Sequence, residues 1–184
     1  MAFAATPRER RGYVFRVNTL FIVAGLPAAG KTTYARGLAN EKKAAFIDID
    51  SGSEPIVKAG LVIAGHDPDD RDSPIFKNAF RIPIYDTLFQ IARDNIENIH
   101  VVIAGPFTAE LGDPTWPEKL AKKLNADIEV HFVACDPEIR RQRMMARGEA
   151  RDASKLADWN AHLAYYENEP APACPHAFID TSGA

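Results

Sequence analysis

The clearest chemical signal in the sequence is a run of eight residues that matches the pattern GxxxxGK(S/T). Its glycines let the backbone curl so that successive amide N–H groups point inward and bind phosphate oxygens. A helix that begins near the lysine adds its N-terminal dipole and its unpaired N–H groups. The pattern therefore predicts a loop that binds a nucleoside triphosphate, ATP with Mg²⁺. The eight residues are Gly25, Leu26, Pro27, Ala28, Ala29, Gly30, Lys31 and Thr32.

The polar side chains at the end of this loop have separate expected roles. Lys31 reaches the β- and γ-phosphates, and the Thr32 hydroxyl coordinates Mg²⁺. Thr33 is expected to donate to the α-phosphate. Such a pattern recurs by accident in about one chain in a hundred of this length at ordinary residue frequencies. Here it also lies between a predicted strand and a predicted helix, which is the structural context that the motif requires.

Two carboxylates close the next apolar run, Phe46-Ile-Asp48-Ile-Asp50. Alternate residues of a strand point to the same face, so Asp48 and Asp50 are expected together beside the γ-phosphate and the substrate. We expect Asp48 to position Mg²⁺ and Asp50 to accept the proton of an attacking hydroxyl group. In the alternative interpretation, Asp48 faces solvent and Asp50 caps the following helix.

Cationic residues recur every four positions near the end of the chain, at Arg143, Arg147, Arg151 and Lys155. On one helix this spacing makes a single stripe, which is costly to assemble unless an anion is present. The charge that spreads over a transferring phosphoryl group would supply that anion, so Arg147 and Arg151 are candidate catalytic residues. A solvated helix face is the alternative.

Two more residues are candidates for contacts with the substrate. Arg81, on a helix between the second and third strands, could bind an acidic or phosphorylated acceptor, and a surface arginine is the alternative. Phe107, which follows Gly105 after the third strand, could line a pocket or belong to the core. A hydrolase of this type usually has an acid at the end of that strand, and this sequence has none there.

Apolar runs rich in β-branched residues alternate with helical patterns along the chain. Strands separated by helices require crossover connections, which predict parallel pairing, a doubly wound α/β sheet and ligands at the carboxyl ends of its strands. Pro83 is expected to kink or divide one helix. The expected strands are 17–24, 44–49, 99–104, 128–134 and 177–180, and the expected helices are 30–40, 74–95, 115–124, 136–147 and 154–168.

The composition narrows the class of protein. The 184 residues, 46% of them hydrophobic, suffice for one globular domain, expected over 17–182 after a loosely held leader at 1–16. A net charge of -3 provides no general field for nucleic acid. The two cysteines form no CxxC pair, which favours a reduced, cytoplasmic compartment. No apolar run approaches the ~20 residues that span a bilayer. We expect a monomer or homodimer with a small-molecule partner.

The segments GLPAAGKTT, FIDID and RMMARGEARD together resemble the small P-loop kinases. This superfamily includes shikimate, gluconate and adenylate kinases, chloramphenicol phosphotransferase and zeta-toxin-like ATPases, and the last group looks most similar around RGEARDASKLADW. The resemblance covers about 17–182. It implies ATP, Mg²⁺ and a three-layer α/β/α sandwich with a five-stranded parallel sheet in the order 2-3-1-4-5. It also implies an arginine-bearing lid at about 147–155.

The resemblance suggests further roles for individual residues. Arg143 is similar to the arginine that stacks on adenine, and Arg147 and Arg151 are similar to lid arginines that contact phosphates. Asp48 and Asp50 look like the paired acids of shikimate kinase. The triple-glycine segment of that enzyme is replaced here by Gly105-Pro-Phe, so shikimate is not the expected acceptor.

Three functions remain open from the sequence. The leading hypothesis is an ATP-dependent phosphotransferase that moves the γ-phosphoryl group to a hydroxyl of a small molecule. A nucleoside monophosphate kinase is the second, although the Asp50 carboxylate would repel a phosphate acceptor. The third is a regulatory ATP-binding protein with slow or no turnover, which the missing acid after the third strand would suit.

Overall fold

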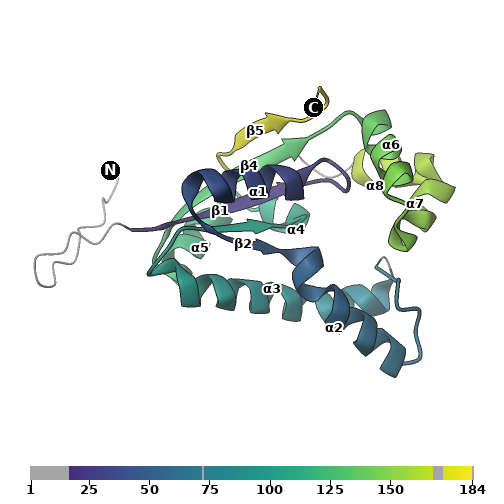
Figure 1. Cartoon of the computed structure of the whole chain (residues 1–184), viewed down its shortest axis with the longest axis horizontal. Helices are drawn as coiled ribbons and strands as arrows, with labels where there is room; N and C mark the ends of the chain where they lie inside the picture. The colour runs from purple at the N-terminus through teal and green to yellow at the C-terminus, as the bar shows by residue number, and fades with distance from the viewer. Residues whose placement is uncertain (1–16, 72, 168–171, 184) are drawn as a thin grey trace, which may run out of the picture.

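Five parallel strands form one sheet in the order β2-β3-β1-β4-β5. The computed structural model describes residues 17–71, 73–167 and 172–183, so the expected leader at 1–16 lies outside the described residues. The sheet order and the flanking helices confirm the α/β fold expected from the sequence (Figure 1). The strands are β1 (Thr19–Gly25), β2 (Ala45–Asp48), β3 (Val101–Ala104), β4 (Asp127–Ala134) and β5 (Ala177–Asp180).

Alternate residues of the central strand β1 build two cores, one on each face of the sheet. Leu20 and Ile22 pack in a cluster with α3 (Pro74–Ile96) and α5 (Trp116–Leu124). Phe21 and Val23 belong to a second cluster, with α1 (Lys31–Lys42). Figure 1 shows α1 and α3 on opposite sides of the sheet. A strand buried on both faces has a continuous apolar sequence, which is why β1 could be predicted.

The helix α2 (Ile49–Ile63) was not predicted, and it begins directly after β2. Its sequence contains Pro55 and two glycines, which lower helix propensity and hide the helical period. Asp48 starts the helix, because its side chain accepts a hydrogen bond of 2.9 Å from the backbone N–H of Ser51. The strand therefore ends at Asp48, one residue before the predicted end.

The sequence suggested that Pro83 would kink or divide one helix, but the structure has a single long helix there, α3. It continues for 23 residues, and its second half packs Leu88, Phe89 and Ala92 into the core. This burial outweighs the one backbone hydrogen bond that a proline removes. None of the helices in the described residues is long and apolar enough to span a membrane.

The predicted helix at 154–168 is in fact two helices, α7 (Ala153–Ala157) and α8 (Trp159–Glu167). Asp158 leaves the helical conformation (φ −136°, ψ 81°), and its carboxylate accepts a hydrogen bond from the N–H of Ala161. A side chain that satisfies the first N–H groups of the next helix stabilises such a break. The remaining elements are α4 (Thr108–Leu111), α6 (Pro137–Arg147) and the short 3-10 helix η1 (Ala150–Asp152).

Phe107 was expected either to line a pocket or to belong to the core, and the structure places it in the core. Its side chain is completely buried, and its ring lies 5.2 Å from that of Tyr85 and 5.8 Å from that of Trp116. A methyl group at Gly105 would lie 2.8 Å from the Phe107 ring, so this glycine makes room for Phe107 and not for a substrate.

We expect Phe107→Ala to lower the free energy of unfolding by about 3–5 kcal/mol, because it leaves a large cavity among aromatic rings. Urea denaturation followed by circular dichroism measures this. Phe178 on β5 is 63% exposed, so Phe178→Ala is the control and should change stability by only about 0.5 kcal/mol. An unfolding free energy of Phe107→Ala equal to that of the control would contradict the assignment to the core.

Candidate active site

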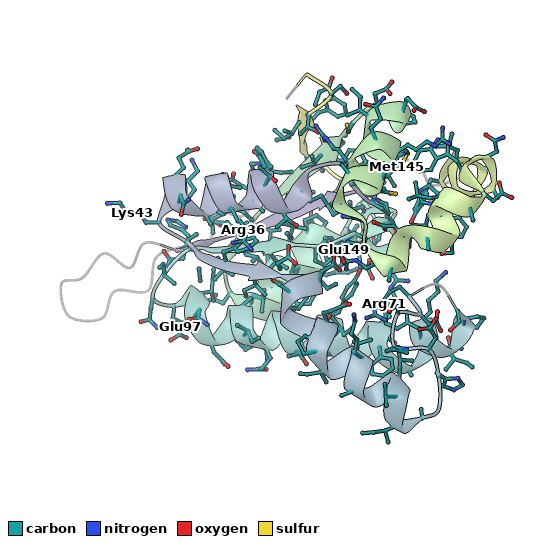
Figure 2. All side chains as sticks on the ribbon, turned by 45° about the vertical axis from the view of Figure 1, so that its right-hand side comes forward. Arg36, Lys43, Arg71, Glu97, Met145 and Glu149 are labelled. Carbon is teal, nitrogen blue, oxygen red and sulfur yellow. The ribbon has the colours of Figure 1, made fainter. Side chains whose placement is uncertain are left out.

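A cleft of about 830 Å³ lies at the carboxyl ends of β1 and β2. The phosphate loop forms one side, α2 and α3 form another, and the segment from α6 to α8 closes over it (Figure 2). Ligands of open α/β sheets bind at this edge. Of the residues predicted from the sequence, those that line the cleft are Pro27, Ala28, Gly30, Lys31, Thr32, Thr33, Asp50, Arg81, Arg143, Arg147, Arg151 and Lys155.

The phosphate loop has the curled backbone that its sequence predicts. Gly25 adopts a φ of 142°, Ala28 a φ of 58° and Gly30 a φ of 88°. A methyl group at Gly25 would lie 2.2 Å from the carbonyl oxygen of Val133, so only glycine fits where β1 leaves the sheet. Helix α1 begins directly after Gly30, and its first three residues line the cleft, which suits phosphate binding at a helix N-terminus.

Lys31 is held within the loop itself. Its Nζ donates a hydrogen bond of 2.7 Å to the carbonyl oxygen of Leu26. Burial lowers the pKa of Lys31 to about 8; Asp50 opposes this shift and Arg147 adds to it. The half-buried ammonium group thus lacks a full complement of anionic partners, and the oxygens of a bound triphosphate would supply them.

Thr32 and Asp48 offer the oxygen ligands that Mg²⁺ prefers. The Thr32 hydroxyl donates a hydrogen bond of 2.8 Å to Asp48 Oδ2, and Asp48 is buried. Among the described residues, no group of three or more His, Cys, Asp or Glu could hold a metal ion. Mg²⁺ in nucleotide sites is commonly held by one or two protein oxygens together with the phosphates, so the pair fits Mg²⁺ bound with a triphosphate.

Asp50 lines the cleft as predicted, but a different element positions it. It lies in the first turn of α2 and not on the strand, so strand alternation is the wrong reason for its position. Its side chain is 59% exposed and lies 3.0 Å from Arg151 Nη1. The alternative roles for the two acids are also corrected, since the buried Asp48 caps the helix and Asp50 does not.

The four predicted cations all line the cleft, but they do not lie on one helix. Helix α6 ends at Arg147 because Gly148 adopts a left-handed conformation with a φ of 62°. Arg151 lies on η1, and Lys155 lies on α7. The expectation of a stripe without matching acids is wrong: Arg147 Nε lies 2.6 Å from the buried Asp152 carboxylate.

Arg143 connects the cleft to the end of β5. Its Nη2 donates a hydrogen bond of 2.8 Å to the carbonyl oxygen of Thr181, and its Nη1 donates to the Thr181 hydroxyl at 3.2 Å. The Thr181 hydroxyl in turn donates to the carbonyl oxygen of Ala29 at 2.7 Å. These bonds fix the guanidinium plane beside the phosphate loop, where it could stack on a planar base.

Arg81 lines the far half of the cleft, but an acid already binds it. Its Nη2 lies 3.1 Å from both carboxylate oxygens of Glu110, and its guanidinium lies 5.6 Å from the centre of the Tyr85 ring. Burial raises the pKa of Tyr85 to about 12, so this phenol stays neutral. An anionic acceptor would therefore have to compete with Glu110 for Arg81.

Several residues that line the cleft were missed in the sequence, some outside the predicted elements and others on helices that were predicted. Glu54 lies one turn after Asp50 on α2, so a prediction of that helix would have placed both on one face. Arg71 lies in a loop whose polar composition carried no recognisable signal. The missed aromatic residues come from distant segments, α3 and α8, and only the fold brings them together. They are Phe76, Tyr85, His162, Tyr165 and Tyr166.

The fold and the phosphate loop define a P-loop protein with the architecture of the small P-loop kinases. The chain belongs to the AAA-domain family, because the family model described as an AAA domain matches residues 20–168. No curated protein matches the sequence significantly.

Solved structures with the same fold include three kinases by name. One from Chloroflexus aurantiacus J-10-fl, provisionally named a kinase, has a TM-score of 0.62 at 19% identity and covers 91% of this chain and 90% of its own. A sugar kinase from Janibacter sp. HTCC2649 has a TM-score of 0.56 at 16% identity, with 91% and 86% covered. A gluconokinase from Sinorhizobium meliloti 1021 has a TM-score of 0.56 at 14% identity, with 91% and 83% covered. At these identities the likeness is one of fold, and it agrees with the expected α/β architecture.

The lowered pKa of Lys31 gives a test of triphosphate binding. With a pKa of about 8, roughly half of the lysines lack a proton at pH 8, and anionic phosphates would restore it. Binding of a triphosphate at pH 8 should therefore take up about half a proton, and the affinity should fall as the pH rises above 8. Calorimetry in two buffers of different ionisation enthalpy measures the uptake.

Lys31→Arg is the control, because a guanidinium group remains protonated at these pH values and should show no uptake. A wild-type binding enthalpy that is the same in both buffers at pH 8 would show that Lys31 does not contact the triphosphate.

Proposed function

We propose that this protein is an ATP-dependent phosphotransferase that moves the γ-phosphoryl group of ATP to a hydroxyl group of a small molecule. The observation that carries the proposal is that one cleft joins the phosphate loop to the carboxylate of Asp50 and to the guanidinium groups of Arg147 and Arg151. Phosphoryl transfer needs mainly positioning and charge stabilisation, and this set of groups can supply both.

The proposed roles follow from the position of each group. The loop amides and Lys31 bind the phosphates, and Arg143 orients the base of the nucleotide. Thr32 and Asp48 would hold Mg²⁺, which would neutralise charge on the phosphate oxygens when bound. Arg147 and Arg151 donate to the oxygens of the transferring group, where negative charge is spread in the transition state. Ordered donors of this kind need little rearrangement when the charge develops.

The transfer step uses Asp50 as the general base. The acceptor oxygen forms a bond to the γ-phosphorus while the bond from that phosphorus to the β,γ-bridging oxygen breaks, and ADP leaves. The hydroxyl proton passes to the Asp50 carboxylate. The half of the cleft beyond Asp50 has room for the acceptor and includes Tyr85, Phe76 and Thr108.

A hydroxyl acceptor suits this cleft better than the phosphate acceptor of a nucleoside monophosphate kinase. A phosphate needs cations that are free to bind it, and Arg81 is already bound by both oxygens of Glu110. Asp50, with its exposed carboxylate, would also repel a phosphate that approached the γ-phosphoryl group.

Asp50→Asn should bind the triphosphate at least as tightly as wild type but lower the rate of phosphoryl transfer by about 10²–10⁴-fold, because an amide cannot accept the proton. Transfer is measured as ATP consumption in the presence of alcohols, aminoglycosides and nucleosides, which first identifies an acceptor. Asp48→Asn is the comparison variant. It should raise the Mg²⁺ concentration needed for activity, and additional Mg²⁺ should partly restore the rate.

Each outcome distinguishes a mechanism. If Asp50→Asn transfers phosphoryl at the wild-type rate, then Asp50 is not the base. If wild type binds ATP but no acceptor accelerates its consumption, the protein is instead a regulatory ATP-binding protein.

A further inference from the structure

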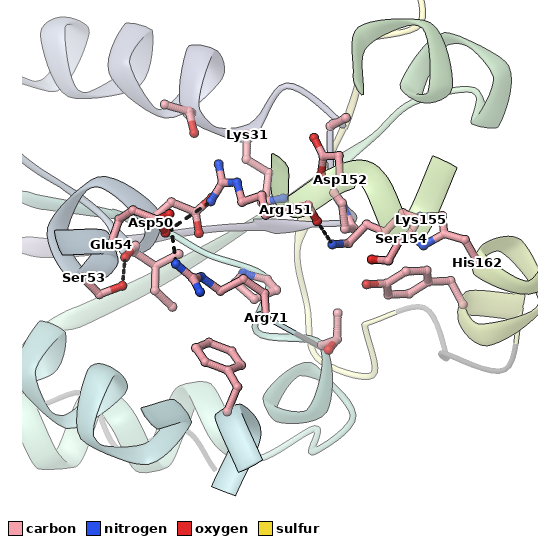
Figure 3. Close-up of a pocket in the computed structure, with 18 of the residues that line it drawn as sticks. Lys31, Asp50, Ser53, Glu54, Arg71, Arg151, Asp152, Ser154, Lys155 and His162 are labelled. Atoms are coloured by element: carbon pink, nitrogen blue, oxygen red, sulfur yellow. Dashed lines mark hydrogen bonds and ion pairs between the residues drawn. The ribbon is translucent and has the colours of Figure 1, made fainter. Parts of the chain in front are cut away.

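Glu54 connects the α2–α3 loop to the segment that covers the cleft. Its Oε1 lies 3.0 Å from Arg71 Nη2, and its Oε2 lies 3.9 Å from Arg151 Nη1. Arg71 is itself fixed, because its Nη1 donates a hydrogen bond of 2.9 Å to the carbonyl oxygen of Pro68. Figure 3 shows the two arginines reaching toward the acids of α2 from different elements.

The same Arg151 nitrogen also lies 3.0 Å from Asp50. Asp50 and Glu54 are four residues apart on α2, so their like charges repel each other unless a cation lies between them. Arg151 supplies that cation. In this arrangement the proposed base and a proposed phosphate-binding arginine neutralise each other, and neither is available for its role in transfer.

We propose that Glu54 is a positioning residue that, together with Asp50, holds Arg151 on α2 until a triphosphate binds. The triphosphate then draws Arg151 away, which frees the Asp50 carboxylate for the acceptor hydroxyl, so nucleotide binds before acceptor. This inference rests on the proposed phosphotransferase function and adds to it an order of binding and a residue that sets that order.

The exchange is physically reasonable for each partner. The Asp50 side chain is 59% exposed, and partly exposed ion pairs are weak, whereas phosphate oxygens accept strong charge-assisted bonds from a guanidinium group. Glu54 would stay in place after Arg151 leaves, because Arg71 and Lys58 continue to hold it at 3.0 and 3.5 Å. Arg151 is therefore the side chain that moves, and Glu54 is the side chain that remains in place.

Glu54→Gln tests the proposal without any acceptor. Losing one of the two α2 carboxylates that hold Arg151 should tighten binding of a non-hydrolysable ATP analogue, roughly two- to fivefold on the scale of one exposed ion pair. The gain should vanish in the double variant with Arg151→Ala, because it acts through that arginine. Glu54→Asp keeps the charge on a shorter side chain, and its affinity should fall between those of wild type and Glu54→Gln.

Glu149→Gln is the matched control. Glu149 also lies 3.9 Å from Arg151, at Nε, but it belongs to the same covering segment and would move with it (Figure 2). It should leave the affinity for the analogue unchanged. Hydrogen exchange of residues 147–157 without nucleotide should be faster in Glu54→Gln than in wild type and in the control, and equal in all three once the analogue is bound.

The outcomes separate this inference from the proposed function. If Glu54→Gln changes neither the affinity nor the exchange, or if its gain persists with Arg151→Ala, Glu54 does not position Arg151. If wild type fails to bind the ATP analogue at all, the proposed function fails first. If wild type binds the analogue and the Glu54 effects are absent, only the positioning role is overturned.

Discussion

The close approach of β1 to β4 at Gly25 determines where the phosphate loop can leave the sheet. Because a methyl group there would lie 2.2 Å from the Val133 carbonyl oxygen, the chain can leave the sheet at this point only as glycine, with a φ of 142°. The loop then turns back over the strand ends and starts α1 at Lys31. The position of the phosphate site is thus a consequence of sheet packing as much as of its polar residues.

Charge balance is the second constraint on the cleft. Arg147 is paired with Asp152, Arg81 with Glu110, and Arg151 with Asp50 and Glu54. A cluster of uncompensated cations would destabilise the fold. The pairs differ in burial, since Asp152 is only 2% exposed and Asp50 is 59% exposed. The pair with the exposed carboxylate can exchange partners most easily, and that carboxylate belongs to Asp50, the proposed base.

Local patterns predicted the sheet and the loop, whereas the composition of the cleft depended on contacts between distant segments. The apolar strands and the phosphate loop can each be recognised from a few consecutive residues, and all five strands of the sheet were predicted. Helix α2 was hidden by Pro55 and its glycines, and with it Glu54. Arg143 and Arg151 were predicted from a four-residue spacing that assumed a single helix. The structure places them on different elements, because Gly148 ends α6. The sequence also misled at Phe107. Gly105 suggested a backbone that a substrate could approach, but it instead makes room for the Phe107 ring in the core.

Asp48 couples the two halves of the site through a single carboxylate. Its Oδ2 accepts from the Thr32 hydroxyl, and its Oδ1 accepts from the N–H of Ser51 at the start of α2. The residue that would hold Mg²⁺ beside the phosphates therefore also fixes the helix that carries Asp50 and Glu54. A change at the metal side, such as a shift of Asp48 toward Mg²⁺, would be transmitted to the first turn of α2 with no intervening residue. Binding of the nucleotide thus has a direct path to the acceptor side, in addition to the one through Arg151.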